Sequence, residues 1–268
     1  MDSYAKSLYL SYTLREAVMR VAIRALQLPP VSQGLDVGCG IGDITSLLAQ
    51  AVAPGGHVTG VDISSELLTY ARQAAKKSGL SKQLSYRKGD MSDLPFEDNA
   101  FDWVWSADCV GYAPVEPLPL IKELVRVVKP GGCIAILAWS SQQLLPGYPL
   151  LEAHLNATSI GIAPFIKGKN PEKHFLRALG WFRQIGLEAS KAQTFIGDVH
   201  APLNEDTRQA LISLIQMRWS GVQSELTGEE WAEFQRLCQP ESPDFILDRP
   251  DYYAFFTYSL FSGKVPES

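Results

Sequence analysis

Residues 35–43 read LDVGCGIGD and place Gly38, Gly40 and Gly42 at every second position, directly after an apolar run. Glycine lets a backbone bend sharply and approach another group closely. The sequence therefore predicts a short strand over 33–37, a glycine loop, and a helix that follows the loop. A strand–loop–helix unit of this kind is typical of sheets that hold a ligand at the carboxyl ends of their strands.

Strand and helix patterns alternate from residue 13 to residue 139. The expected strands cover 33–37, 57–62, 83–88, 101–106 and 133–139. The expected helices cover 13–28, the stretch after Gly42 through Ala51, the stretch from Ser64 or Ser65 to Gly79, and 118–128. Because the inner strands are apolar on both faces, this alternation predicts βαβ units and a mostly parallel sheet. We therefore expect an α/β fold, Rossmann-like, with helices on both faces of the sheet.

The alternation weakens after residue 140. Helices are expected over 171–185, 205–219 and 228–238, and strands over 189–199 and 252–261. The last two strands would form the antiparallel end of a seven-stranded sheet. The segments 140–168 and 203–250 are long for plain connections and are expected to cover a site. The expected organisation is an N-terminal helical cover (1–30), a core (31–200 with 251–264) and a helical cap (203–250), with 140–168 also covering the site.

Composition narrows the class of protein. The chain has 268 residues, of which 46% are hydrophobic, enough to bury a sizeable α/β core. Acidic residues outnumber Lys and Arg by 29 to 24, which argues against a general nucleic-acid binder. The four cysteines are scattered without metal-ligand spacing, so no metal is expected. The chain shows neither a signal-peptide pattern nor an apolar run of roughly 18 residues, so we expect no membrane span and a cytoplasmic setting.

Polar residues stand at four predicted strand ends, namely Asp36 through Gly42, Asp62, Asp90, and Ser106 through Asp108. The carboxyl ends of parallel strands meet at one edge of a sheet, and ligands bind in the crevice outside that edge. We therefore expect these side chains to surround one ligand site.

The spacing of the glycines excludes two phosphate-binding loops. A Walker loop requires a Lys followed by Ser or Thr after its glycines, and none follows here. The dinucleotide fingerprint requires a third glycine three residues after the second, where this chain has Asp43. Asp36 and Asp43 flank the loop with negative charge, which disfavours a pyrophosphate and favours a ligand that carries positive groups.

Five segments together resemble a known family. LDVGCGIGD (35–43) is similar to motif I of class I S-adenosylmethionine-dependent methyltransferases. Four further segments resemble the later motifs of this family in their usual order: VDIS with Asp62, GDMSDLPF with Asp90, FDWVWS (101–106) and VVKPGGCIAIL. The resemblance covers roughly residues 30–140 and is to the broad branch that includes the ubiquinone and menaquinone biosynthesis enzymes. It implies S-adenosylmethionine as cofactor, S-adenosylhomocysteine as product and a small-molecule acceptor.

The resemblance also implies contacts to the methionine end of the cofactor. The backbone of Gly38 and Gly40 would lie against the methionine, and Ser106 would contact it through its backbone. Asp36 would orient the α-amino group, directly or through water. The N-terminus of the helix after the loop would receive the carboxylate, as helix N-termini do for anions. Asp43 has a second interpretation, as a charge that complements the dipole of that helix.

Contacts to the adenosine follow in the same way. Asp62 would accept hydrogen bonds from both ribose hydroxyls, because a carboxylate offers two acceptor oxygens. Ile63 would pack on the adenine, and Asp90 would accept from its amino group with Met91 beside it. A structural interpretation remains for Asp62, since an acid at a strand end is often a turn or helix-capping residue.

Methyl transfer from a sulfonium is an in-line displacement with a neutral leaving group. The enzyme must mainly hold nucleophile and methyl close together in a dry site. An oxygen or nitrogen nucleophile also needs a base, which the sequence does not identify. The candidates are His154, His200, Tyr148 and Asp108, and for the two histidines a surface or core position is the alternative interpretation.

The covering segments are rich in bulky apolar groups, among them Leu144, Leu145, Trp219 and Trp231. These residues fit either the wall of an apolar pocket or the core of a helical cap, and one set can serve as both. We therefore expect an apolar or aromatic acceptor. Two other functions stay open, an NAD(P)-dependent oxidoreductase and a non-catalytic module that binds S-adenosylmethionine. The oligomeric state is not indicated.

Overall fold

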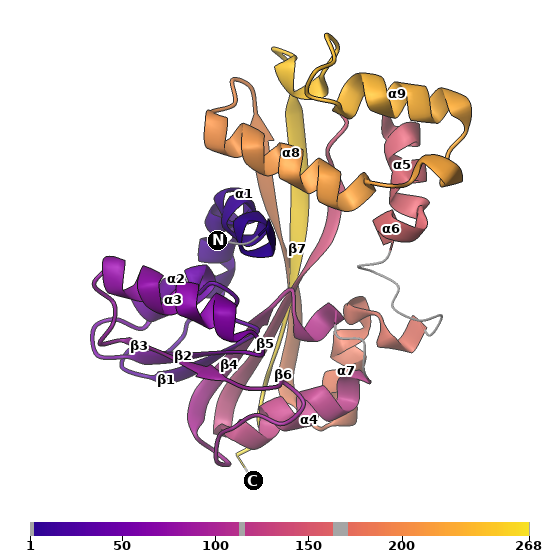
Figure 1. The fold of residues 1–268 in the computed structure, drawn as a ribbon. Helices are drawn as coiled ribbons and strands as arrows, with labels where there is room; N and C mark the ends of the chain where they lie inside the picture. Colours follow the sequence, from indigo (N-terminus) through magenta and orange to yellow (C-terminus); the bar gives the residue numbers. More distant parts are fainter. Residues whose placement is uncertain (1–2, 113–115, 163–170, 268) are drawn as a thin grey trace.

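The glycine-rich segment follows an inner strand of a seven-stranded sheet (Figure 1). The structure is a computed structural model that describes residues 3–112, 116–162 and 171–267. The strand order is β3-β2-β1-β4-β5-β7-β6. The strands are β1 (Gln33–Val37), β2 (His57–Asp62), β3 (Leu84–Lys88), β4 (Phe101–Ala107), β5 (Val128–Gln143), β6 (Glu188–His200) and β7 (Tyr253–Lys264). The expected seven-stranded α/β fold is therefore confirmed.

The sheet is parallel from β3 to β5 and antiparallel at its other end. β1 pairs in parallel with both β2 and β4, and β7 runs antiparallel to β5 and β6. The chain builds outward from β1 to β2 and β3, then returns to place β4 on the other side of β1. This reversal of strand order lies between β1 and β4. Open α/β sheets bind their ligands at such a point, outside the carboxyl ends of the strands.

Helices cover both faces of the parallel part (Figure 1). One face carries α1 (Ser3–Ala25), α2 (Asp43–Ala51) and α3 (Ser65–Lys77), and the other carries α4 (Pro117–Val127) and α7 (Ala178–Gln184). Alternate residues of each strand face opposite sides. Trp103 and Trp105 share a buried cluster with α1 and α2, whereas Leu35 and Val37 share one with α4 and α7. This division explains why the inner strands are apolar on both faces.

The cap is built on the long ends of β5, β6 and β7, which extend beyond the parallel part of the sheet (Figure 1). It contains α5 (Pro149–Ala157), α6 (Ser159–Ile162), α8 (Glu205–Trp219) and α9 (Gly228–Cys238). Helix α1 packs against both α2 and α8, so it joins the sheet layer to the cap. Because cap and core share one hydrophobic cluster, the domain boundaries expected at 203 and 250 stay a prediction.

Three elements differ from the expected ones. Helix α1 begins at Ser3 rather than at residue 13, which places Tyr4 and Leu8 on the same helix as Arg15. The helix expected over 171–185 is two short turns followed by α7, because His174 is extended and its Nδ1 accepts a hydrogen bond from the amide of Leu176. β5 begins at Val128 instead of residue 133. From residue 163 onward, the expected covering segment 140–168 lies outside the described residues.

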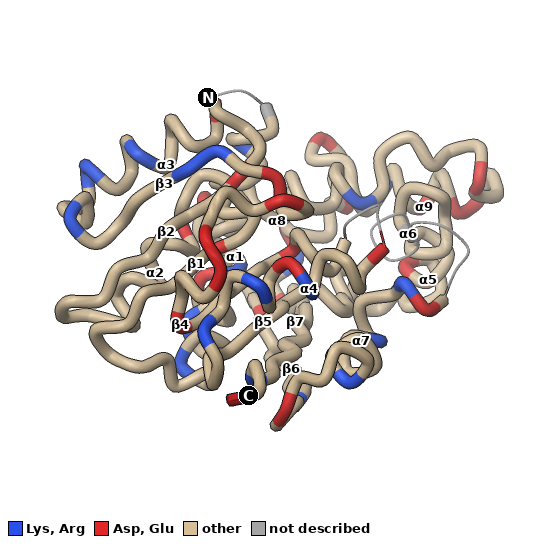
Figure 2. The backbone as a smooth tube through the Cα atoms, turned by 90° about the horizontal axis from the view of Figure 1, so that it is seen from below, with Lys and Arg blue, Asp and Glu red and all other residues tan. Residues whose placement is uncertain are grey.

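Charge is unevenly distributed over the sheet. Lys and Arg gather on α3 and β3 at one edge (Figure 2). Arg87 and Lys88 of β3 are exposed there. Charged side chains on an edge strand hinder pairing with another chain.

Within the described residues, no helix combines the length and apolar character that crossing a membrane requires.

The packing of β1 on β4 generates a testable prediction. A Cβ atom added at Gly34 would lie 2.0 Å from Cζ2 of Trp103, which is itself held by a hydrogen bond to Ser32. Gly34→Ala should therefore lower the free energy of unfolding by about 2–3 kcal/mol through overpacking. Urea unfolding measures this loss.

Gly180→Ala is the matched control, because nothing lies within 4 Å of that Cβ position in α7. It should be neutral or stabilise by up to about 1 kcal/mol, since alanine favours helix more than glycine does. Equal stability of the Gly34→Ala variant and the wild type would contradict the close packing of Trp103.

Candidate cofactor site

The carboxyl ends of β1, β2 and β4 open into a cavity of about 300 Å³. Its wall includes residues from all three strand ends, from the glycine loop, and from α1. A smaller cavity of about 130 Å³ adjoins it and shares Gly38, Asp62, Ile63 and Cys109 with its wall. The polar strand ends that the sequence singled out are thus brought together at one edge of the sheet.

The glycine loop adopts a backbone that other residues rarely adopt. Gly38, Gly40 and Gly42 have φ angles of 79°, 54° and 84°, all in the left-handed region. The amides of Gly38 and Cys39 both donate to the carbonyl of Val61, at 2.9 and 3.0 Å. A Cβ at Gly38 would lie 2.4 Å from Sγ of Cys109. The loop is therefore held against β2 and against the turn after β4.

Asp62 links the glycine loop to the start of α3. Its Oδ2 accepts from the amide of Gly40 at 2.9 Å, and its Oδ1 accepts from the amide of Ser64 at 2.9 Å. The capping residue of α3 is Ser64, whose side chain accepts from the amide of Leu67. Each carboxylate oxygen can accept a second hydrogen bond, so Asp62 retains acceptor capacity toward the cavity it lines. Its ribose contact stays a prediction.

Two other carboxyl groups in the larger cavity are buried enough to hold their protons more tightly. Burial raises the pKa of Asp36 to about 7, although the hydroxyl of Thr45 donates to its Oδ2 at 2.7 Å. Burial likewise raises the pKa of Asp43 to about 6, and the charge of Arg15 acts in the opposite direction. One oxygen of Asp43 is buried and has no hydrogen-bond partner among the described residues.

The smaller cavity is lined by Ile63, Asp90 and Met91, which the sequence assigned to an adenine. Asp90 is exposed, and its Oδ1 accepts from the amide and hydroxyl of Ser92, which lowers the pKa of Asp90. Ser106 lines neither described cavity: its side chain is buried and its Oγ accepts from the amide of Val110. These assignments stay predictions.

Asp108 lines the larger cavity but both of its oxygens are engaged. Oδ1 accepts from the amide of Trp139 at 2.9 Å, and Oδ2 accepts from the hydroxyl of Tyr258 at 2.9 Å and from Arg15 at 3.2 Å. Its φ of 50° is unusual for a residue other than glycine and accompanies this network. Sequence reasoning did not find Arg15 or Tyr258, because an amphipathic helix and an apolar strand carry no motif that marks them.

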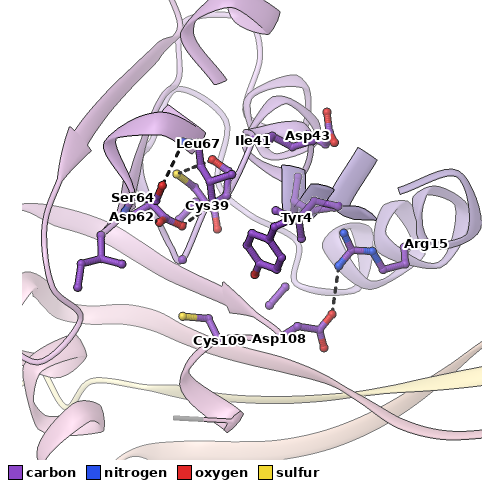
Figure 3. Close-up of a pocket in the computed structure, with 17 residues that line it drawn as sticks. Tyr4, Arg15, Cys39, Ile41, Asp43, Asp62, Ser64, Leu67, Asp108 and Cys109 are labelled. Carbon is purple, nitrogen blue, oxygen red and sulfur yellow. Dashed lines mark hydrogen bonds and ion pairs between the residues drawn. The ribbon is translucent and has the colours of Figure 1, made fainter. Parts of the chain in front are cut away.

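Figure 3 shows how these side chains are arranged. Asp62 lies at one end of the cavity, and Arg15 and Asp108 lie at the other. The ring of Tyr4 lies between them (Figure 3). Tyr4 is 62% exposed, so it lies at the open edge of the cavity. Helix α1 therefore forms one wall of the cavity.

The remaining candidate bases do not line either described cavity. His154 of α5 contacts Glu230 of α9, within the cap. His200 ends β6, and its Nδ1 lies 2.9 Å from the carbonyl of Ala201. Tyr148 precedes α5 beneath the guanidinium of Arg236, which lies 5.9 Å from the ring centroid. Their catalytic roles stay predictions without support from this geometry.

The burial of Asp36 predicts a pH-dependent stability. Because its folded-state pKa of about 7 lies above the ordinary value, the folded protein keeps a proton that the unfolded chain loses near pH 4. The stabilisation present at low pH is therefore lost as pH rises toward 7. Asp36→Asn removes this ionisation, so its stability relative to wild type should increase by about 2 kcal/mol between pH 5 and pH 8.

Urea unfolding at both pH values measures this difference. The control is Asp198→Asn, which makes the same substitution at an exposed carboxyl on β6. The same relative stability of Asp36→Asn at pH 5 and pH 8 would show that Asp36 titrates normally.

Comparisons with known proteins agree with this architecture. A family model described as a methyltransferase domain matches residues 35–136. The demethylmenaquinone methyltransferase of Bacillus cytotoxicus is 35% identical over 136 residues, which are 51% of this chain and 56% of that protein. The chain thus matches little more than half the length of this curated relative.

Solved structures resemble the whole fold. The YcgJ protein of Bacillus subtilis aligns over 94% of this chain and all of its own, with a TM-score of 0.57 and 17% identity. A SAM-dependent methyltransferase from Aquifex aeolicus aligns over 99% of this chain and all of its own, with a TM-score of 0.55 and 17% identity. Such low identities show a shared fold. Residues 35–136 therefore match a methyltransferase domain, and they lie within a longer sheet whose fold solved methyltransferases share.

Proposed function

We propose that the whole protein transfers a methyl group from S-adenosylmethionine to a small-molecule acceptor. The observation that carries this proposal is the cavity at the ends of β1, β2 and β4, where the left-handed glycine loop and Asp62 stand together. The four cysteines are free thiols, which supports a reducing compartment, and we place the activity in the cytoplasm.

The residues present fit this cofactor. Asp62 lines the cavity and each of its oxygens can accept one more hydrogen bond, which suits a ribose diol. The smaller cavity beside it, with Ile63, Asp90 and Met91, suits a flat base with an amino group. The glycine loop and Asp36 then remain for the methionine end. Along the two cavities the base, the ribose and the amino acid would therefore follow one another as they do in S-adenosylmethionine.

The charge of the larger cavity favours this ligand over a nicotinamide dinucleotide. Four carboxyl groups line it, those of Asp36, Asp43, Asp62 and Asp108. The ionised carboxylates among them would repel a pyrophosphate and attract the sulfonium and ammonium groups of S-adenosylmethionine, and these positive groups would also favour ionisation of Asp36 and Asp43. The alternative function of an NAD(P)-dependent oxidoreductase is disfavoured on this ground.

The chain's contribution to the chemistry is to position the reactants and to exclude water. The cofactor supplies an electrophilic methyl carbon; the acceptor's electron pair forms the new bond while the carbon–sulfur bond breaks and its electrons stay on sulfur. Helix α1 closes one wall of the cavity with Tyr4 and Leu8. A dry, enclosed site brings the reacting atoms to near-attack distance. Because Asp108 accepts from Trp139, Tyr258 and the charged Arg15, we assign it no proton transfer.

We propose an apolar or aromatic acceptor, and aromatic side chains pack beside Asp108 at one end of the larger cavity. Trp139 stacks on Phe256 with ring centroids 4.6 Å apart, and the edge of Tyr258 approaches it at 5.4 Å. The hydroxyl of Tyr112 donates to the carbonyl of Trp139. Trp139, Phe256 and Tyr258 are buried in the core, and these rings line neither described cavity, so they fix the surroundings of Asp108 without identifying the acceptor. Support for an apolar or aromatic acceptor comes from the name of the curated relatives, demethylmenaquinone methyltransferase.

Ligand-induced stabilisation tests the cofactor. A ligand that binds only the folded state raises the melting temperature according to its concentration and affinity. S-adenosylmethionine and S-adenosylhomocysteine should raise it, and NADPH should not. Asp62→Asn should abolish most of the shift, because it removes one of the two acceptor oxygens, while Asp206→Asn on α8 serves as the control. Stabilisation by NADPH alone would favour the oxidoreductase.

Methyl transfer itself is tested with S-adenosylmethionine labelled in its methyl group. The acceptors are a short-chain demethylmenaquinone in its reduced form and a simple naphthol. We expect label in the organic phase with at least one of them, and no label when the acceptor is omitted. Tight cofactor binding without transfer to any aromatic acceptor would favour the non-catalytic module.

A further inference from the structure

One positively charged side chain lines the larger cavity among its four carboxyl groups. Within the described part of the chain, Arg15 of α1 is the sole Lys or Arg of that wall. The side chain of Arg15 is 15% exposed to solvent. For a ligand that carries both charges, the carboxyl groups could bind its positive groups and Arg15 could bind its negative group.

Arg15 is held in place by residues from distant strands. Its Nη1 contacts Oδ2 of Asp108 at 3.2 Å. Asp108 is in turn fixed by the hydroxyl of Tyr258 on β7 and by the amide of Trp139 on β5. The guanidinium therefore has a defined position before any ligand arrives, which reduces the entropy lost on binding.

The hydrogen bonds of Arg15 are incomplete. Its Nε is buried and has no partner among the described residues. A buried donor without an acceptor is destabilising, and a guanidinium can bind a carboxylate through two parallel hydrogen bonds. An anionic group bound beside Asp108 would therefore offset this cost.

Arg15 also lies at the appropriate end of the site. The adenine-sized cavity with Asp90 adjoins the Asp62 end of the larger cavity, and Arg15 lies at the opposite end beside Asp108 (Figure 3). A nucleoside whose ribose is bound by Asp62 would thus extend its amino-acid end toward Arg15.

The N-terminus of α2 is the other candidate for an anion. Asp43 already places a carboxyl group in its first turn, with one oxygen buried and unpartnered. That carboxyl uses the favourable end of the helix dipole and would repel a second carboxylate. The carboxylate that contacts Arg15 is that of Asp108, and its Oδ2 is shared with the hydroxyl of Tyr258.

We propose that Arg15 binds the α-carboxylate of the cofactor's methionine end, and that Asp108 and Tyr258 are positioning residues for its guanidinium. This assignment rests on the proposed function and extends it to one atom group of the ligand. It makes α1 a part of the binding site instead of a cover alone.

Two ligands that differ in one group test the assignment by isothermal titration calorimetry. They are S-adenosylhomocysteine and its decarboxylated form, which keeps the ammonium group. Arg15→Met should weaken binding of S-adenosylhomocysteine by about 10- to 100-fold, as expected for a lost charge-assisted hydrogen bond. Binding of the decarboxylated ligand should change by less than about threefold. Arg20→Met, on an exposed side of the same helix, is the control and should change neither.

Two further variants keep the test independent of folding defects. Arg15→Lys retains a charge and should lose less affinity for S-adenosylhomocysteine than Arg15→Met does. Tyr258→Phe removes only the hydroxyl that holds Asp108 and should weaken S-adenosylhomocysteine by a few fold while sparing the decarboxylated ligand.

Equal losses for both ligands would overturn the assignment, because Arg15 would then act only by holding α1 in place. Unchanged binding of S-adenosylhomocysteine by Arg15→Met would overturn it as well. These outcomes leave the proposed function intact. A wild-type protein that binds neither ligand would instead overturn the proposed function, and the role of Arg15 with it.

Discussion

The site depends on the two hydrogen bonds that the carboxylate of Asp62 accepts from backbone amides. Asp62 ends β2 and accepts from the amides of Gly40 and Ser64, so one side chain holds both the glycine loop and the start of α3. The left-handed loop needs such a restraint, because glycine loses more conformational entropy on ordering than any other residue. Asp62 therefore shapes the cavity that it also lines, and its structural and ligand-binding interpretations are compatible.

A second network joins the methyltransferase domain to the rest of the chain. Asp108, which follows β4, is linked to Arg15 of α1 and to Tyr258 of β7. These contacts span 93 and 150 residues of sequence. The long ends of β5 to β7 carry the cap, and α1 lies between that cap and α2 (Figure 1). The cavity is thus completed by α1, which lies outside residues 35–136.

Local chemistry made the first half of the chain predictable. Glycines at alternate positions need a backbone with positive φ, and acids at strand ends lie at one edge of a parallel sheet. Asp36, Asp62 and Asp90 were placed near the site on this basis, and all three line a cavity. The candidate bases were less predictable. A histidine in a covering segment has no local signal of the direction it faces, and His154 faces Glu230 within the cap.

The sequence by itself determined the strand–loop–helix unit and the acids around it, because backbone conformation and strand-end position follow from neighbouring residues. Only the tertiary structure decided which of those acids are buried, so that the pKa of Asp36 rises to about 7. It alone brought Arg15 and Tyr258 to Asp108, and so turned a candidate base into part of a fixed network. Burial and long-range pairing depend on how distant elements pack, and no local pattern encodes them.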